Sequence, residues 1–158
     1  MKWSTFELRK LHRTDNRFAY VCDCSDLIGE NDEDLAGVSP VNVSGTFEYD
    51  EIGERYIFSI DIACHLTMLC AITLDEVDVP LNFHSILEFA SVVKDDFTLP
   101  IEGTTIDLDP FIWAEIMVEK PMRVLSENAY RNYREEIIEL DEAEKMADNP
   151  FAKLQKKN

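Results

Sequence analysis

Four cysteines and two histidines are the residues of this chain best suited to metal chemistry: Cys22, Cys24, Cys64, His65, Cys70 and His84. A structural zinc ion needs four ligands, which usually come as two closely spaced pairs such as C-x2-C. None of these spacings is of that kind, and Cys64 and His65 point to opposite faces if they lie on a strand. The pattern therefore predicts no metal and no cofactor. We expect the cysteines to be buried, reduced thiols.

The 32 acidic residues are too numerous for any two to stand out as a general acid and base. Asp107 and Asp109 flank Leu108 where a helix is predicted to begin, and the simpler role for Asp109 is to cap that helix. Glu115 and Glu119 lie one helical turn apart and are expected to form a solvated face. The chain has no nucleophile elbow, phosphate-binding glycine loop or H-E-x-x-H motif, and only five glycines. We therefore predict no catalytic residues and no enzymatic activity.

Charge is unevenly distributed along the chain, whose formal net charge is −17. Residues 1–17 hold five basic and two acidic side chains, and residues 153–158 hold three basic and no acidic ones. The net charge argues against a general nucleic-acid binder, which needs a basic surface against phosphates. The acidic body is expected to attract a basic protein, while the basic ends suit contact with RNA. The alternative is that these charges only keep the protein in solution.

The length and the apolar pattern favour one cytoplasmic domain. A chain of 158 residues is long enough to bury a core, and we expect a single domain over residues 1–158 with a flexible tail from about residue 141. No apolar segment follows Met1 and Lys2, and no run of 18 apolar residues occurs. Neither a signal peptide nor a membrane span is therefore expected, and the partners should include no membrane and no DNA.

The stretch from Tyr56 to Leu74 organises the predicted fold. Every even-numbered residue in it is apolar, whereas the odd-numbered set contains polar residues. This period of two predicts a strand with one face buried. One straight strand of this length would measure about 60 Å, so we expect a sharp bend, bulge or turn around Cys64 to Met68. The stretch should form the central pair of an antiparallel sheet.

Further strands are predicted on both sides of this stretch. Residues 18–24 and the segment beginning at Val41 have strand patterns, and Asp50 to Glu54 forms a hairpin loop. Residues 77–89 form the next alternating set, in which Pro80 demands either a sheet edge or a bulge. Together these patterns predict an α+β fold with an antiparallel meander sheet, bent or barrel-like.

Two helices are predicted to pack on this sheet. Ser4 and Glu7 form a capping box for a short helix from Thr5 to about Leu11, and Trp3 and Leu8 occupy the positions of a hydrophobic staple. The second helix covers about residues 110–119. It is opened by Asp109 and Pro110, is stopped by Pro121, and carries an apolar face of Ile112, Trp113, Ile116 and Met117.

The remaining segments are predicted less sharply. Residues 25–37 form a polar connection with turns at Asn31 and Gly37 and one helical turn around Asp32 to Leu35. Residues 90–105 form a long loop. The region from Ser126 to Asp148 is either a helix or, over Tyr133 to Leu140, a late strand, and Pro150 to Leu154 is expected to form one helical turn.

Several stretches resemble one known family. They are the opening MKWSTFELRKL, the central CAITLDEVDVPLNF from Cys70 to Phe83, IDLDPFIWAEIMVEKPM from Ile106 to Met122, and the weaker NPFAKLQK at the end. They resemble the YceD family of large ribosomal RNA subunit accumulation proteins, in its low-GC Gram-positive type. Ile72 and Thr73 stand where many members have an arginine and a second cysteine, which leaves a metal or redox role for that pair in doubt. Phe151 replaces the usual arginine of the tail.

The resemblance implies a cytoplasmic, non-enzymatic factor that supports the accumulation or processing of large-subunit ribosomal RNA and assembly of the large ribosomal subunit. Its partners would be that RNA or a precursor ribosomal particle, together with a basic ribosomal protein or assembly factor. Our hypothesis from the charges is that RNA is contacted by Arg9, Lys10, Arg13, Arg17, Lys153, Lys156 and Lys157. Two alternatives remain open: the basic residues of the first helix form an ordinary solvated face, and the protein is an acidic adaptor that binds proteins without touching RNA.

Overall fold

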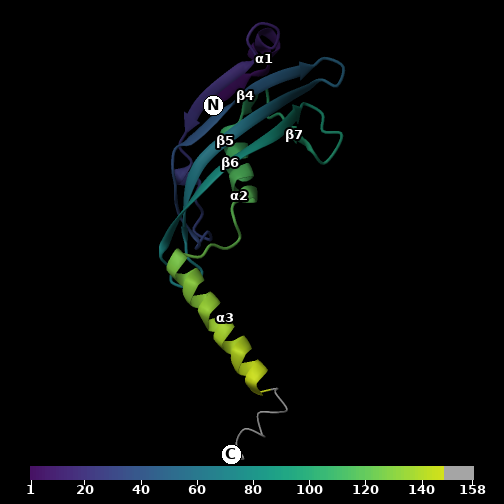
Figure 1. Ribbon diagram of the computed structural model, residues 1–158. Helices are drawn as coiled ribbons and strands as arrows, with labels where there is room; N and C mark the ends of the chain where they lie inside the picture. The colour runs from purple at the N-terminus through teal and green to yellow at the C-terminus, as the bar shows by residue number, and fades with distance from the viewer. Residues whose placement is uncertain (148–158) are drawn as a thin grey trace, which may run out of the picture.

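A curled, mostly antiparallel sheet is the centre of this α+β protein (Figure 1). The computed structural model describes the backbone of residues 1–147 and the side chains of residues 1–144. Helix α1 (Thr5–Leu11) lies at one end of the sheet, α2 (Asp109–Glu119) lies against it, and α3 (Glu127–Ala147) projects from the other end. The predicted fold class, with a bent meander sheet and two helices at the expected places, is confirmed.

The longest pairing in the sheet joins β5 (Arg55–Leu69) to β6 (Glu76–Ala90). The register runs without a shift from Arg55 opposite Ala90 to Leu69 opposite Glu76. The expectation of a sharp bend, bulge or turn within the strand at residues 64–68 was therefore wrong, because the curl of the sheet spreads the bending over the whole strand (Figure 1). The irregularity at this level lies in the neighbouring strand, between Leu35 and Gly37, which pair with Met68 and Thr67. The predicted alternation is confirmed, since every even-numbered side chain from Tyr56 to Cys70 is buried.

Strand β5 is central, as predicted, because it is paired along both sides. Strand β4 (Val41–Asp50) pairs with its first part, through the predicted hairpin loop, and β3 (Leu35–Val38) pairs with residues 66–68. Strand β2 (Arg17–Cys22) lies outside β4. The short β7 (Thr98–Pro100) adds to β6 in parallel, so that the sheet order is β2-β4-β5-β6-β7.

Pro80 lies at a sheet edge, which was one of its two predicted positions. Within the described residues, the side of β6 away from β5 is paired only at Glu88–Ala90, by β7. The missing N–H of Pro80 therefore faces an unpaired side. The alternative of a bulge was wrong, because Pro80 lies in register opposite His65.

Three loop predictions need correction. Gly37 lies in β3 and pairs with Thr67, so it is not in a turn. The 3₁₀ helix of this connection is η1 (Ser25–Leu27), and the predicted Asp32 to Leu35 forms one hydrogen-bonded turn, in which the Leu35 N–H donates to the Asp32 carbonyl (2.9 Å), but no helix. The predicted loop of residues 90–105 contains β7 and the start of β8 (Thr105–Asp107). Strand β8 pairs with β1 (Lys2–Ser4). Both strands are only three residues long, so no local sequence pattern could indicate this pairing.

The N-terminal helix is confirmed and the second helix is shifted by one residue at its start. Ser4 and Glu7 form the full capping box of α1. The N-cap of α2 is Leu108 and not Asp109, which is the first helical residue. The carboxylate of Asp109 accepts a hydrogen bond from Tyr20 Oη (3.0 Å), and the Asp109 N–H donates to Asp107 Oδ1 (3.3 Å). Asp107 thus supplies the capping oxygen from outside the helix.

The core lies between the even-numbered face of β5 and the two helices. Leu8 of α1 and Ile112 and Ile116 of α2 are fully buried in it, and Trp3, Trp113 and Met117 pack at its margin. The ring of Phe58 is surrounded by four other aromatic rings, with centroid distances of 5.7 to 6.1 Å to Trp3, Phe18, Phe47 and Phe89. The ambiguous region after Ser126 is a helix, α3, and not a strand. The predicted turn at Pro150 to Leu154 lies outside the described residues.

Gly45 of β4 allows the close approach of β5. A Cβ atom at this position would lie 2.2 Å from the carbonyl oxygen of Ser59, closer than any real contact. We expect Gly45→Ala to lower the free energy of unfolding by about 1–3 kcal/mol, because the backbone must shift. Gly37→Ala is the matched control, since its Cβ would meet Thr67 at an ordinary 3.7 Å. Urea unfolding of both variants tests this, and equal losses would contradict it.

Candidate functional site

Two of the predicted RNA-contacting residues are bound by the protein's own side chains. Arg9 Nε donates to Tyr56 Oη (2.7 Å), and its guanidinium lies 4.9 Å from the centre of the Tyr49 ring. Arg13 pairs with Glu51 of the β4–β5 loop. Arg9 and Arg13 therefore fasten α1 to the sheet, and a ligand at either residue must compete with these contacts.

The other predicted RNA contacts are placed differently. Lys10 on α1 and Arg17 at the start of β2 are exposed, and within residues 1–144 neither forms an ion pair. Lys153, Lys156 and Lys157 lie outside the described residues. The structure thus leaves Lys10 and Arg17 as the basic residues of the first 17 that are free to meet a partner at this end of the molecule.

A serine, a histidine and an aspartate form a chain of hydrogen bonds on the outer face of the sheet. His84 Nδ1 lies 2.8 Å from Asp61 Oδ1, and His84 Nε2 lies 3.1 Å from Ser59 Oγ. This is the order of groups in a Ser-His-Asp triad. Sequence analysis missed it because the three residues come from two strands whose register was unknown. The signal was the alternation itself, since Ser59 and Asp61 share one face of β5.

The surroundings of this group do not support nucleophilic catalysis. Ser59 lies on β5 between Thr46 of β4 and Ile86 of β6, so the N–H groups around it belong to the two ladders. An acyl-transfer site needs free N–H donors for the developing oxyanion. The group therefore ties β5 to β6 by cross-strand hydrogen bonds, as does the pair of His65 Nδ1 and Asp78 Oδ2 at 2.9 Å.

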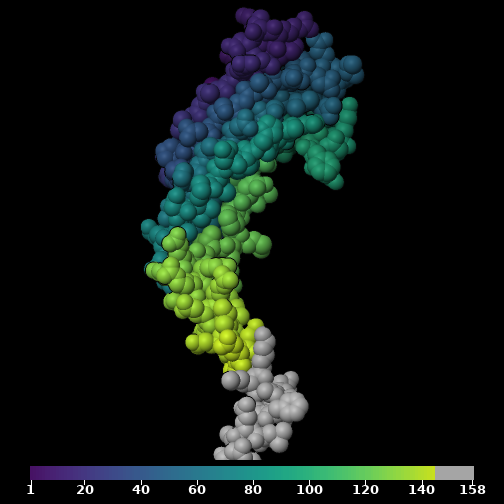
Figure 2. All heavy atoms as spheres, viewed as in Figure 1, coloured from purple at the N-terminus to yellow at the C-terminus, as the bar shows by residue number. Residues whose placement is uncertain are grey.

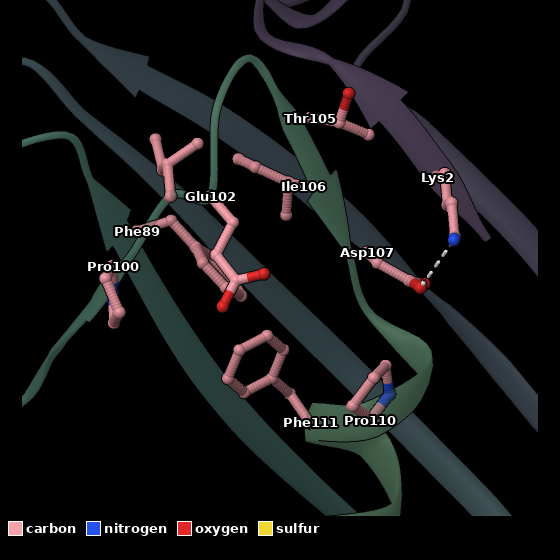
Figure 3. A pocket seen from close by; sticks show the side chains of 10 residues that line it. Lys2, Phe89, Pro100, Glu102, Thr105, Ile106, Asp107, Pro110 and Phe111 are labelled. Carbon is pink, nitrogen blue, oxygen red and sulfur yellow. Dashed lines mark ion pairs between the residues drawn. The ribbon is translucent and has the colours of Figure 1, made fainter.

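A cavity of about 390 Å³ opens between the end of the sheet and the start of α2 (Figure 3). Its walls are mainly apolar and include Phe89 and Phe111, while Glu102 points toward it. Lys2 and Asp107 form an ion pair on its rim, with 3.4 Å between Lys2 Nζ and Asp107 Oδ2. Because these charges neutralise each other, the cavity offers mainly apolar contact, with the Glu102 carboxylate beside it.

Three of the cysteines are ordinary buried thiols, as the sequence predicted. Cys22, Cys24 and Cys64 are buried and free. Burial raises the pKa of all three thiols, that of Cys24 to about 12, so they stay protonated. Within the described residues no group of three or more His, Cys, Asp or Glu side chains could hold a metal ion.

Cys70 differs from the other three. It is fully buried at the end of β5, where its sulfur accepts hydrogen bonds from the N–H groups of Thr73 (3.5 Å) and Ser126 (3.3 Å). Hydrogen bonding to Thr73, and then to Ser126, lowers the pKa of this thiol to about 6. Cys70 therefore acts as the acceptor that joins the β5–β6 turn to the start of α3.

Two predicted carboxylate roles also change. Asp107 and Asp109 organise the start of α2 and its contacts with Lys2 and Tyr20. Glu115 was expected on a solvated face, but its Oε2 accepts a hydrogen bond from Ser85 Oγ of β6 at 2.6 Å. This contact holds α2 to the sheet. Only Glu119 of that pair is exposed as expected.

Helix α3 carries exposed apolar residues that sequence analysis did not single out. Tyr130, Tyr133, Ile137 and Leu140 repeat at intervals of three, four and three residues, and we call them the α3 stripe. All four are exposed. The spacing was visible in the sequence, but the choice between helix and strand hid it, since only a helix brings these residues onto one face.

Comparison with known proteins gives one relative. The chain is 26% identical over 132 residues to the uncharacterized protein YlbN of Bacillus subtilis (strain 168), a match that covers 81% of this chain and 75% of that protein. No protein-family model and no solved structure matches the chain. Among the described helices, none is both long and apolar enough to cross a membrane.

The hydrogen-bonded Ser59 group gives a direct test of the enzymatic alternative. We expect no covalent adduct when the protein is treated with a fluorophosphonate, because the two ladders use the backbone N–H groups around Ser59. Intact mass spectrometry measures this, with Ser59→Ala as the control. An adduct on the wild-type protein that disappears in Ser59→Ala would contradict the structural interpretation.

Cys70 should make stability depend on pH. Its folded-state pKa lies below the ordinary value of about 8.5, so its contribution to stability is complete above that pH and is lost as pH falls through about 6. We expect the difference in unfolding free energy between the wild-type protein and Cys70→Ala to grow from pH 6 to pH 8.5. Urea unfolding under reducing conditions measures this difference.

The control for this experiment is Cys64→Ala. Burial raises the pKa of the Cys64 thiol in the folded state, and the ordinary value of about 8.5 applies in the unfolded state, so this thiol is protonated in both states from pH 6 to about pH 7.5. The difference between the wild-type protein and Cys64→Ala should therefore stay constant over that range and fall slightly toward pH 8.5, opposite to the change expected for Cys70→Ala. A Cys70→Ala difference that is equally constant over that range would show that the Cys70 sulfur binds Thr73 and Ser126 as a neutral thiol.

Proposed function

We propose that this protein is a cytoplasmic, non-enzymatic factor of the YceD family, which supports the accumulation or processing of large-subunit ribosomal RNA and assembly of the large ribosomal subunit. In this role it binds a precursor particle rather than transforming a substrate. Its acidic body contacts a basic protein, and its basic residues contact RNA.

The observation that carries the proposal is how the family-like stretches fold together. The opening stretch contains β1 and α1, and the stretch from Ile106 to Met122 contains most of β8 and all of α2. Although about 100 residues separate them, β1 and β8 pair, with Trp3 opposite Ile106. The resemblance therefore falls on one structural unit. The match to YlbN supports a relationship over most of the chain, but its name carries no function.

The distribution of exposed charge supports the division of roles. Lys10 and Arg17 are exposed near α1, whereas α3 at the opposite end carries seven carboxylates and three basic residues. Phosphate groups would be attracted to the first end and repelled from the second. This arrangement favours an RNA contact near Lys10 and Arg17 and a protein contact elsewhere.

A second candidate function is an acidic adaptor that binds proteins and does not touch RNA. The observation that favours it is the pairing of Arg9 with Tyr56 and of Arg13 with Glu51. Of the four N-terminal residues predicted to contact RNA, only Lys10 and Arg17 then remain unpaired among the described residues. Two phosphate contacts alone give weak binding with only a modest salt dependence, because the slope of log K against log salt grows with the number of phosphates neutralised.

Sedimentation of cell lysate at low and high salt tests the proposal. We expect the protein to migrate with large-subunit precursors at low salt and to leave them as salt rises, because phosphate contacts release counterions. The variant Lys10→Glu with Arg17→Glu should leave the particles at lower salt than the wild-type protein. Lys94→Glu is the control for the single variant Lys10→Glu, because it makes the same charge change at an exposed lysine away from α1 and α3.

Each result decides between the two functions. If Lys10→Glu with Arg17→Glu still migrates with the particles as the wild-type protein does, the RNA contact at α1 is wrong and the adaptor is favoured. If the wild-type protein stays at the top of the gradient at every salt concentration, the proposed role in large-subunit assembly is wrong.

A further inference from the structure

Helix α3 leaves the body of the protein almost at once. Between Glu127 and Glu144, Ala129 is the one buried side chain. The attachment is made just before and within the first turn, where Ser126 N–H donates to Cys70 Sγ and Ala71 N–H donates to the Val124 carbonyl. Its 21 residues span about 30 Å. Figure 2 shows the helix standing clear of the sheet as a separate projection.

The α3 stripe has the geometry of a coiled-coil seam without a partner. Its members occupy a and d positions of a heptad, with Tyr130 and Ile137 at a and Tyr133 and Leu140 at d. Tyr130 is 58% exposed, Tyr133 49%, Ile137 41% and Leu140 62%. The stripe also continues the face of Ala129, which docks on the body. A row of apolar side chains in water marks a surface that binds something.

A second apolar surface lies on the body, beside the start of α3. A pocket of about 220 Å³ is lined by Cys70 and Val124, whose contacts hold the start of α3. Leu74 and Met122 line the same pocket and are 70% and 98% exposed. A partner that follows the stripe toward the body therefore finds a further apolar site at its base.

The charges beside this surface select the partner. From Glu135 to Glu144 the helix carries six carboxylates and no basic residue. Glu136 and Asp141 occupy the g and e positions that flank the seam, and Arg134 is the basic exception at the other e position. At the base, Glu33 and Arg123 line the pocket with opposite charges, and Asp34 is paired with Lys120, so the acidic character of the surface comes from the helix. The surface as a whole complements a basic partner.

A second copy of this chain fits the surface poorly. Pairing two copies brings the acidic segments together, and each copy has a formal net charge of −17. Four partly exposed side chains also supply less than the about 800 Å² per partner that a stable complex uses. A partner that continues into the basal pocket has more area available, and opposite charge removes the repulsion.

We propose that the α3 stripe and the pocket at its base are the docking surface for a basic amphipathic helix of a partner protein. The apolar face of that helix packs along the α3 stripe, and its flanking lysines or arginines meet Glu136 and Asp141. The inference rests on the proposed function for the class of partner, a basic protein, but needs no contact with RNA.

Binding of a synthetic helix to the full-length protein tests the proposal. The probe is a fluorescently labelled 21-residue peptide with leucine at every a and d position, lysine at every e and g position and glutamine elsewhere. Fluorescence anisotropy measures its binding to the protein. Lysines at e and g prevent the peptide from pairing with itself. A scrambled peptide of the same composition keeps the charge but loses the apolar face. We expect the scrambled peptide to bind at least tenfold more weakly.

Variants of the protein locate the binding surface. Tyr133→Gln with Ile137→Gln should weaken peptide binding at least tenfold, while glutamine preserves the helix, as circular dichroism can verify. Ile52→Gln is the control, because it removes an even more exposed apolar side chain, in the β4–β5 loop at the other end of the sheet. Glu136→Lys with Asp141→Lys should weaken binding of the lysine peptide and create binding of the same peptide with glutamate in place of lysine.

Three results would overturn the inference. They are equal binding of the ordered and scrambled peptides, unchanged binding by Tyr133→Gln with Ile137→Gln, and a wild-type dimer in analytical ultracentrifugation that this double variant converts to a monomer. None of them concerns migration with ribosomal precursors. The docking proposal can therefore be wrong while the proposed function is right. If the peptide binds but the protein does not migrate with ribosomal precursors, the proposed function alone is wrong.

Discussion

The unbroken pairing of β5 with β6 is the constraint on which the other elements depend. Because the side-chain period of a strand is two, a shift of one residue anywhere in this pairing would exchange its buried and exposed faces. The even-numbered face of β5 supplies most of the core, against which α1 and α2 close. A single register along the whole pairing therefore fixes both helices, the hairpin to β4 and the position where α3 begins.

The same pairing determines where function can lie. On the outer face, Ser59, Asp61 and His84 have the right chemistry for a triad but lie over backbone groups that the ladders already use. A strand that is paired along both edges can present side chains on its face, but its backbone N–H groups are not free to bind a reacting atom. The outer face can therefore bind a partner through its side chains without forming an oxyanion site, and the ends of the sheet, near α1 and near α3, offer further surfaces.

Much of the fold could be predicted from the sequence because its main signals are local. The alternation from Tyr56, the capping box of Ser4 and Glu7 and the hairpin at Asp50 to Glu54 each depend on residues close in sequence. The failures involve distant partners. Asp109 does not cap α2 because Tyr20, almost 90 residues away, holds its carboxylate. Likewise the β1–β8 pairing and the bonds of Cys70 to Ser126 depend on tertiary structure that no local pattern contains.

The position of α3 has consequences for how binding would proceed. A helix that is attached only through its first turn gains little stability from the body, whereas most helices in proteins owe their stability to tertiary packing. A partner that covers the α3 stripe would therefore stabilise the helix as well as bind it. The carboxylates from Glu135 to Glu144 act over a longer range than the apolar side chains. They should govern the rate at which a basic partner arrives, whereas Tyr133, Ile137 and their neighbours should govern how long it stays.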